Sequence, residues 1–333
     1  MIIREFLYVD PHKVSSLLAQ LNDGIDMEHR RTSRSERRTD TGFKGVLGHY
    51  QGSGEEQYVT KTLGDLVFPS LEEALESEGM IRDLSDELSD EQYWTPDRLQ
   101  TLNPLGSIVR ITARGCLFDA RYIASVFSGF ATTTKGVLGL TGTQVSSQVA
   151  SSKPKQQPAK KASQQQPQRS SAQLEDQIDD FEMGDVNGDL LRSFIRVSRG
   201  IFTPGLHLNL MPTPDNSYVV GARLQEGRQY LDGDIEVLFS RYGIGEQEWT
   251  LVGSIGVYGA QNQSTQLEPF VDGATVSRGK FLRYINNSIG NMNATGFMDL
   301  PQSPGFSVVP FAVYRTIPRG KGQSVELPHP VAP

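Results

Sequence analysis

The apolar positions near the start of the chain change period after ten residues. The run EFLYVD at residues 5–10 is rich in strand-forming residues, and Val14, Leu17, Leu18 and Leu21 then follow at the i, i+3, i+4, i+7 spacing of a buried helix face. The pattern therefore predicts a strand, a tight turn and a helix. From Asp23 to about Thr62 the periodicity gives way to glycine, serine, threonine and charged residues, which is typical of a long mobile loop.

Periodic order returns in the second part of this half. Leu71 and Leu75 lie on one face of a helix that we expect to end near Gly79. The segment GSIVRITARGCLFD at residues 106–119 alternates with period two, which predicts a half-buried strand. Residues 120–140 then begin with a helical stripe of apolar side chains.

The second half of the chain contains a helix, four strand-like runs and two further helices. The first helix, at residues 188–202, precedes runs and helices that predict the order β-β-α-β-α-β. The strand-like runs are GLHLNLMP (205–212), SYVVGARL (217–224), EWTLVGSIGVYG (248–259) and FSVVPFAVYRTI (306–317), and the helices are GDIEVLFSRYG (233–243) and GKFLRYINNSIGNM (279–292). Pro310 inside the last run predicts an edge position or a bulge, because proline cannot donate to a strand ladder.

Composition divides the chain between these two halves. Residues 143–180 are rich in Gln, Ser, Pro and Lys and nearly lack large apolar groups, so we expect a disordered linker. The sequence thus predicts an α+β protein with an N-terminal lobe at 1–142, a C-terminal lobe at 181–317 built on a four-stranded, mainly antiparallel sheet with helices, and a loose tail at 318–333. The two lobes can still pack together into one body.

The charge and cysteine content narrow the class of protein. The formal net charge of −7 argues against a general affinity for phosphate backbones, and the single cysteine, Cys116, excludes an intramolecular disulfide or a cysteine-built metal site. No run approaches 18 consecutive apolar residues and the first residues lack the features of a signal peptide. We therefore expect a cytoplasmic protein without membrane contact.

Asp10 and Pro11 stand where the first strand meets the first helix. An aspartate at this position resembles a metal ligand or nucleophile at a strand end, but Asp10 followed by Pro11 also matches an N-cap and the first helical position. The cap is the favoured interpretation, because a phosphotransferase-type motif has a second acid two positions later and this chain has His12 there. A metal-dependent hydrolase that uses Asp10 stays open as the least favoured alternative.

No other catalytic, metal-binding or cofactor template is complete. The five histidines share no metal-site spacing, Cys116 has no histidine near it, and the glycine-rich stretches lack the Gly-Lys-Ser/Thr of a phosphate loop. We accordingly predict no catalytic residue, no metal ligand and no cofactor, and favour binding or regulation over catalysis.

Two groups of residues are candidates for contact with a partner. Five arginines in a glycine- and serine-rich segment suit phosphate groups, although neighbouring acids weaken that charge; they are Arg30, Arg31, Arg34, Arg37 and Arg38. The second group combines aromatic residues with strand glycines that admit a close approach, and the alternative is helix packing on a glycine-lightened sheet; its members are Tyr242, Trp249, Gly253 and Gly256.

Several of these segments together resemble a known family. The opening FLYVDPHKVSSLLAQLNDGI, the later VVGARLQEGRQYLDGDIEVLFSRYG with EWTLVGSIGVYG, and the closing VVPFAVYR are similar to the bacterial family catalogued as domain of unknown function 6414. The resemblance implies a prokaryotic cytoplasmic protein and an association with phage-defence or mobile-element loci. It supplies no activity, cofactor or site residue.

The sequence therefore predicts a non-catalytic interaction or regulatory protein whose partner is another protein. Nucleic-acid or nucleotide binding through the basic loop at residues 30–38 is the alternative, and the oligomeric state is left open.

Overall fold

The computed structural model describes most of the chain but not all of it. The described residues are 3–21, 53–140, 178, 181–183, 185–259, 270–272 and 275–318. The expected linker at 143–180 lies outside them except for Ile178, which is buried between α6 and α7, and the loose tail lies outside except for Pro318. Most of the expected loop at 23–62 also lies outside, although helix α3 (Ser53–Ser77) begins within it. Order thus starts about ten residues earlier than the sequence pattern predicts.

The predicted strands and helices of the first half are present. Strand β1 (Ile3–Val9) leads into α1 (Pro11–Leu21), and α3 ends before Gly79, whose φ of 64° is the left-handed conformation common after a helix. The remaining elements are β2 (Ile81–Asp83), α4 (Ser85–Ser89), the 3-10 turn η1 (Glu91–Trp94), α5 (Pro96–Leu102), β3 (Ile108–Phe118) and α6 (Ala120–Leu140).

The second half contains the predicted helices and strands together with four short strands. In chain order they are β4 (Glu182–Met183), β5 (Val186–Asn187), α7 (Gly188–Ile201), β6 (Leu206–Leu210), β7 (Val220–Leu224), α8 (Ile235–Tyr242), β8 (Gln247–Tyr258), β9 (Val271–Asp272), β10 (Thr275–Val276), α9 (Arg278–Ala294) and β11 (Phe306–Ile317). The pairing of β8 with β11 changes register at Pro310, which confirms the predicted bulge.

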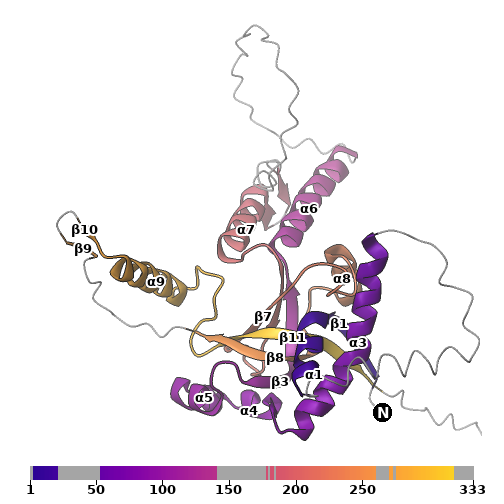
Figure 1. Cartoon of the computed structure of the whole chain (residues 1–333). Helices are drawn as coiled ribbons and strands as arrows, with labels where there is room; N and C mark the ends of the chain where they lie inside the picture. Colours follow the sequence, from indigo (N-terminus) through magenta and orange to yellow (C-terminus); the bar gives the residue numbers. More distant parts are fainter. Residues whose placement is uncertain are drawn as a thin grey trace, which may run out of the picture.

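The sheet is a closed barrel, which corrects the prediction of a four-stranded sheet in a separate lobe. Five strands pair around a ring in the order β3, β6, β7, β11, β8 and back to β3. Figure 1 labels four of them, β3, β7, β8 and β11, in the middle of the molecule. All pairs are antiparallel except β7 with β11. Strand β1 extends the sheet beside β11, and β2 extends it beside β3. Because β3 comes from the first half, the two predicted lobes share one core.

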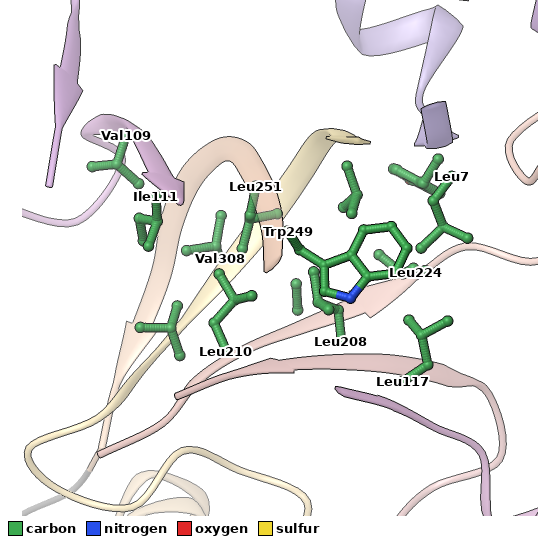
Figure 2. Close-up of a cluster of buried hydrophobic side chains, with 14 of the residues drawn as sticks. Leu7, Val109, Ile111, Leu117, Leu208, Leu210, Leu224, Trp249, Leu251 and Val308 are labelled. Carbon is green, nitrogen blue, oxygen red and sulfur yellow. The ribbon is translucent and has the colours of Figure 1, made fainter. Parts of the chain in front are cut away.

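The barrel interior is filled by alternate side chains of all five strands. Trp249, Leu251, Leu208 and Leu224 lie among its buried side chains (Figure 2). Each residue comes from the inward face of its strand, so the period-two patterns read from the sequence become the barrel core. The interior is a packed core with the large indole of Trp249 at its centre, 1% exposed.

A second apolar layer covers the outside of β8 and β11. Helices α1 and α3 bring Val14 and Phe68 against Val252, Phe311 and other buried side chains of these strands. Strand β8 is consequently buried on both faces over its middle residues.

Glu72 of α3 ties this helix to the sheet through a polar cluster. Its carboxylate accepts from Arg110 Nη2 at 2.7 Å and from the Tyr314 hydroxyl at 3.0 Å, and it pairs with Arg4 Nη2 at 2.5 Å. Arg110 also donates to Glu76. Three strands, β1, β3 and β11, are thereby bonded to one nearly buried side chain.

Candidate functional site

Asp10 lies at the start of α1 with its carboxylate engaged in local bonds. Oδ1 accepts from the backbone N–H groups of His12 at 3.1 Å and Lys13 at 3.0 Å, and Oδ2 pairs with Lys13 Nζ at 3.0 Å. Pro11 is the first helical residue. This is the geometry of an N-cap, in which the side chain replaces the partners that first-turn N–H groups lack. His12 is exposed and its ring lies 6.5 Å from that of Tyr230.

Tyr242 and Trp249 are packed inside the molecule and not presented at its surface. They are 3% and 1% exposed, and their rings meet edge to face with centroids 5.2 Å apart. Arg315 lies over both rings and bonds to Glu5, while burial and the nearby Glu5 raise the pKa of Tyr242 to about 12. Burial therefore removes these two aromatic residues from the candidate partner surface.

Gly253 and Gly256 admit a neighbouring strand and not a ligand. A Cβ at Gly253 would lie 2.3 Å from the carbonyl oxygen of Val309, and one at Gly256 would lie 3.1 Å from Val309 Cγ2. Both glycines therefore admit the close approach of the paired strand β11, which is neither a ligand nor the helix of the packing alternative. The basic cluster of Arg30, Arg31, Arg34, Arg37 and Arg38 lies outside the described residues.

His207 joins the two long insertions of the barrel. Its Nε2 lies 3.1 Å from Asp299 Oδ2, and Asp299 also accepts from the backbone N–H of Thr203 at 3.1 Å and from its hydroxyl. Thr203 follows the insertion between β3 and β6, and Asp299 belongs to the insertion between β8 and β11. Partial burial works to raise the pKa of Asp299, but the bonds from His207 and Thr203 outweigh it and hold that pKa at about 2.

Side chains on the outer face of β3, β6 and β7 form a row beside the contact between His207 and Asp299. Phe118 pairs with His207, and His207 pairs with Arg223. The Phe118 ring lies 4.3 Å from that of Phe202, and Arg223 Nη2 donates to the carbonyl of Pro204 at 2.6 Å. The row thus presents an aromatic ring and an exposed guanidinium on the outside of the barrel.

The insertion between β3 and β6 forms a helical hairpin that stands away from the barrel. Helices α6 and α7 lie side by side in Figure 1, and Ala124 and Ala131 of α6 pack with Leu191 and Ile195 of α7. Phe181 completes this small core. One face of each helix is therefore satisfied within the hairpin.

A second apolar stripe of α6 faces solvent. Val126, Phe130, Val137 and Leu140 recur at helical spacing, and their exposure rises to 90% at Leu140. The spacing places the stripe roughly 145° around the helix from the Ala124 and Ala131 face. α7 repeats the feature with exposed side chains at Leu190, Phe194 and Val197. Contiguous exposed apolar surface of this kind marks a site of interaction.

The sequence reasoning missed this stripe, although a signal for it was present. It identified the beginning of 120–140 as one apolar stripe, but the later Phe130, Val137 and Leu140 continue at helical spacing on a different face from Ala124 and Ala131. Two apolar stripes on one helix indicate two packing partners. Among the described residues α7, Ile178 and Phe181 pack on the Ala124 and Ala131 side, and the Phe181 ring also lies 6.3 Å from that of Phe130.

A metal site has no candidate in the part of the chain that the structure describes. That part contains no group of three or more His, Cys, Asp or Glu side chains placed to hold a metal ion. Burial raises the pKa of the Cys116 thiol, with Glu246 adding to the effect. Among the described residues, no helix has the length and apolar character needed to cross a bilayer.

Comparison with known proteins gives a family but no individual relative. No curated protein and no solved structure matches the chain significantly. One family model matches residues 3–314, from the first residue of β1 to the ninth residue of β11, and so spans both the barrel and its insertions. The chain therefore belongs to the family described as Domain of unknown function (DUF6414).

Proposed function

We propose that this protein is a non-catalytic interaction protein in which the barrel is a rigid scaffold and the α6–α7 hairpin binds a partner protein. The observation that carries the proposal is the solvent-facing stripe of α6 at Val126, Phe130, Val137 and Leu140. Helices bury one apolar stripe in an ordinary domain, and a second stripe needs a second partner.

The glycines of α6 support close approach by that partner. Gly129, Gly136 and Gly139 each have open space where a side chain would stand. Three glycines lower the intrinsic stability of a helix, so their presence beside the stripe needs a compensating contact. A helical or extended apolar segment of another protein supplies such a contact.

Affinity capture with the full-length chain tests this proposal. The wild-type protein and a Phe130→Glu/Val137→Glu variant are used as bait in lysate of the source cells, with bound proteins quantified by mass spectrometry. We expect one partner to be lost with the double variant and kept with Thr132→Glu, which adds a charge to an exposed position of the same helix. Equal recovery by all three baits, or no specific partner, contradicts the proposal.

Nucleic-acid binding on the barrel is a second candidate, favoured by one observation. Numbered along the chain, the ring order of the five strands is first, second, third, fifth, fourth, with the third and fifth parallel. This is the order of the OB-fold, whose second and third strands and flanking loops bind oligonucleotides. The corresponding strands here are β6 and β7, beside the row of Phe118 and Arg223. The likeness lies in strand order, and function on such a fold depends on the residues of the site.

That test measures binding of a labelled single-stranded oligonucleotide by fluorescence anisotropy. Arg223→Ala and Phe118→Ala should each weaken binding roughly tenfold, since stacking and phosphate contacts are each worth about 1–3 kcal/mol. Arg241→Ala, which removes an exposed arginine paired with Asp232, is the control. Binding that falls only when the five arginines at 30–38 are replaced assigns the contact to the loop instead.

A further inference from the structure

Helix α9 is mostly exposed among the described residues, and Phe270 packs on its Phe281 and Tyr284 rings. The helix projects sideways from the barrel (Figure 1), and Asn293 is its one buried residue. Phe281, Leu282 and Ile285 are exposed along its first half, and every residue from Thr275 to Arg283 is exposed. An isolated helix of 17 residues is marginal in water, so α9 needs a surface to pack on.

The charged residues of α9 indicate what kind of surface the helix packs on. Arg278, Lys280 and Arg283 lie in its first two turns, and the helix contains no acidic residue. Cations at a helix N-terminus oppose the helix dipole. None of the three forms an ion pair with any residue that the structure describes. The partner of α9 must therefore combine apolar groups with negative charge.

The same chain carries such a surface on α4, η1 and α5. We call it the acidic knob, and its exposed carboxylates without an ion pair among the described residues are Asp86, Asp90, Glu91 and Asp97. Leu102 and Leu105 are exposed beside them. The knob and α9 thus match in both respects, with opposite charge and with apolar groups to bury.

We propose that α9 of one copy docks on the acidic knob of a second copy, and that the second copy returns the same contact. A reciprocal exchange of this kind closes into a twofold dimer, the commonest symmetry of homo-oligomers. The occupant of both surfaces is a copy of this chain, because the two complementary surfaces occur together on it.

The test is a charge exchange followed by sedimentation velocity on the full-length chain. One variant, called the arm variant, carries Lys280→Glu and Arg283→Glu on α9. The other, called the knob variant, carries Asp86→Lys and Glu91→Lys, and these two substitutions keep the capping bond from Gln92 N–H to Asp90. The wild type should dimerise and dissociate with added salt, since exposed pairs are screened. Each variant alone should associate at least about tenfold more weakly, because like charges face each other.

The mixture of the two variants decides the question. In a mixed pair the reversed α9 faces the reversed knob and the unreversed α9 faces the unreversed knob. Both contacts then join opposite charges, so equal amounts of the two variants should form a heterodimer. Arg196→Glu on α7, an exposed arginine outside both surfaces, should leave the dimer unchanged. Monomeric wild type, or variants that stay monomeric when mixed, overturns the proposal. Contact between α9 and the knob of its own chain gives a monomeric wild type, and so does a monomeric chain whose α9 binds added oligonucleotide.

Discussion

Neutralising Glu72 should destabilise the protein more than any other single carboxylate change in the described structure. The side chain is 3% exposed and receives Arg4, Arg110 and the Tyr314 hydroxyl. Glu72→Gln keeps the shape but leaves two guanidinium groups, themselves only 22% and 20% exposed, without their shared counter-charge. Removing one partner of a buried ion pair costs about 3–5 kcal/mol.

We expect the loss of stability in Glu72→Gln to lie at the lower end of that range. Arg110 keeps Glu76 and Asp83 as partners, whereas Arg4 keeps, among the described residues, the Tyr314 ring 5.1 Å away. We expect a loss of about 3 kcal/mol in the free energy of unfolding.

Urea unfolding followed by circular dichroism measures this loss. The midpoint should fall by about 1 M with the slope unchanged. Glu73→Gln, at the neighbouring exposed position of α3, is the matched control and should change stability by less than about 0.5 kcal/mol. A Glu72→Gln midpoint equal to that of the control refutes the role assigned to the cluster.

Three further predictions concern stability. Gly253→Ala should prevent folding or cost more than about 3 kcal/mol, because the added Cβ would lie 2.3 Å from the Val309 carbonyl oxygen. Gly129→Ala, on open helix surface, should instead stabilise the protein by about 0.5–1 kcal/mol. Thermal melts compare the two variants, and equal effects contradict the packing argument. Burial and the nearby Glu72 raise the pKa of Tyr314 to about 12, so its contribution to stability is complete below pH 10 and is lost as the pH rises toward 12; Tyr314→Phe should flatten that decline in melting temperature. Asp10→Ala should cost about 1 kcal/mol and Asp10→Asn much less by the same melts, since asparagine still caps a helix; equal losses argue against a cap.

Local elements were predictable from sequence because their causes are local. Gly243 ends α8 with φ of 70°, and Pro310 marks the bulge of β11, as composition and spacing predict. The helix at 120–140 likewise follows from its own periodicity.

Closure of the barrel was not predictable, because it depends on pairing between distant strands. β3 and β6 are separated by a long insertion, and no alternation within either strand specifies which strand lies beside it. The same limit applies to Trp249. The sequence shows that aromatic residues are frequent around it, but closure of the barrel determines which face of the sheet carries its indole ring. The exposed apolar surfaces on α6 and α9 show only in the three-dimensional structure, because their exposure depends on where the other helices lie.

The most direct test of the interaction function is site-specific photo-crosslinking from α6 in living source cells. A photoreactive phenylalanine analogue replaces Phe130 in the full-length chain, and in a second strain it replaces Thr132. We predict a discrete protein adduct of defined mass from position 130 and none from position 132. Absence of a protein adduct at position 130, or identical adducts from both positions, contradicts the assignment of the α6 stripe as a partner-binding surface.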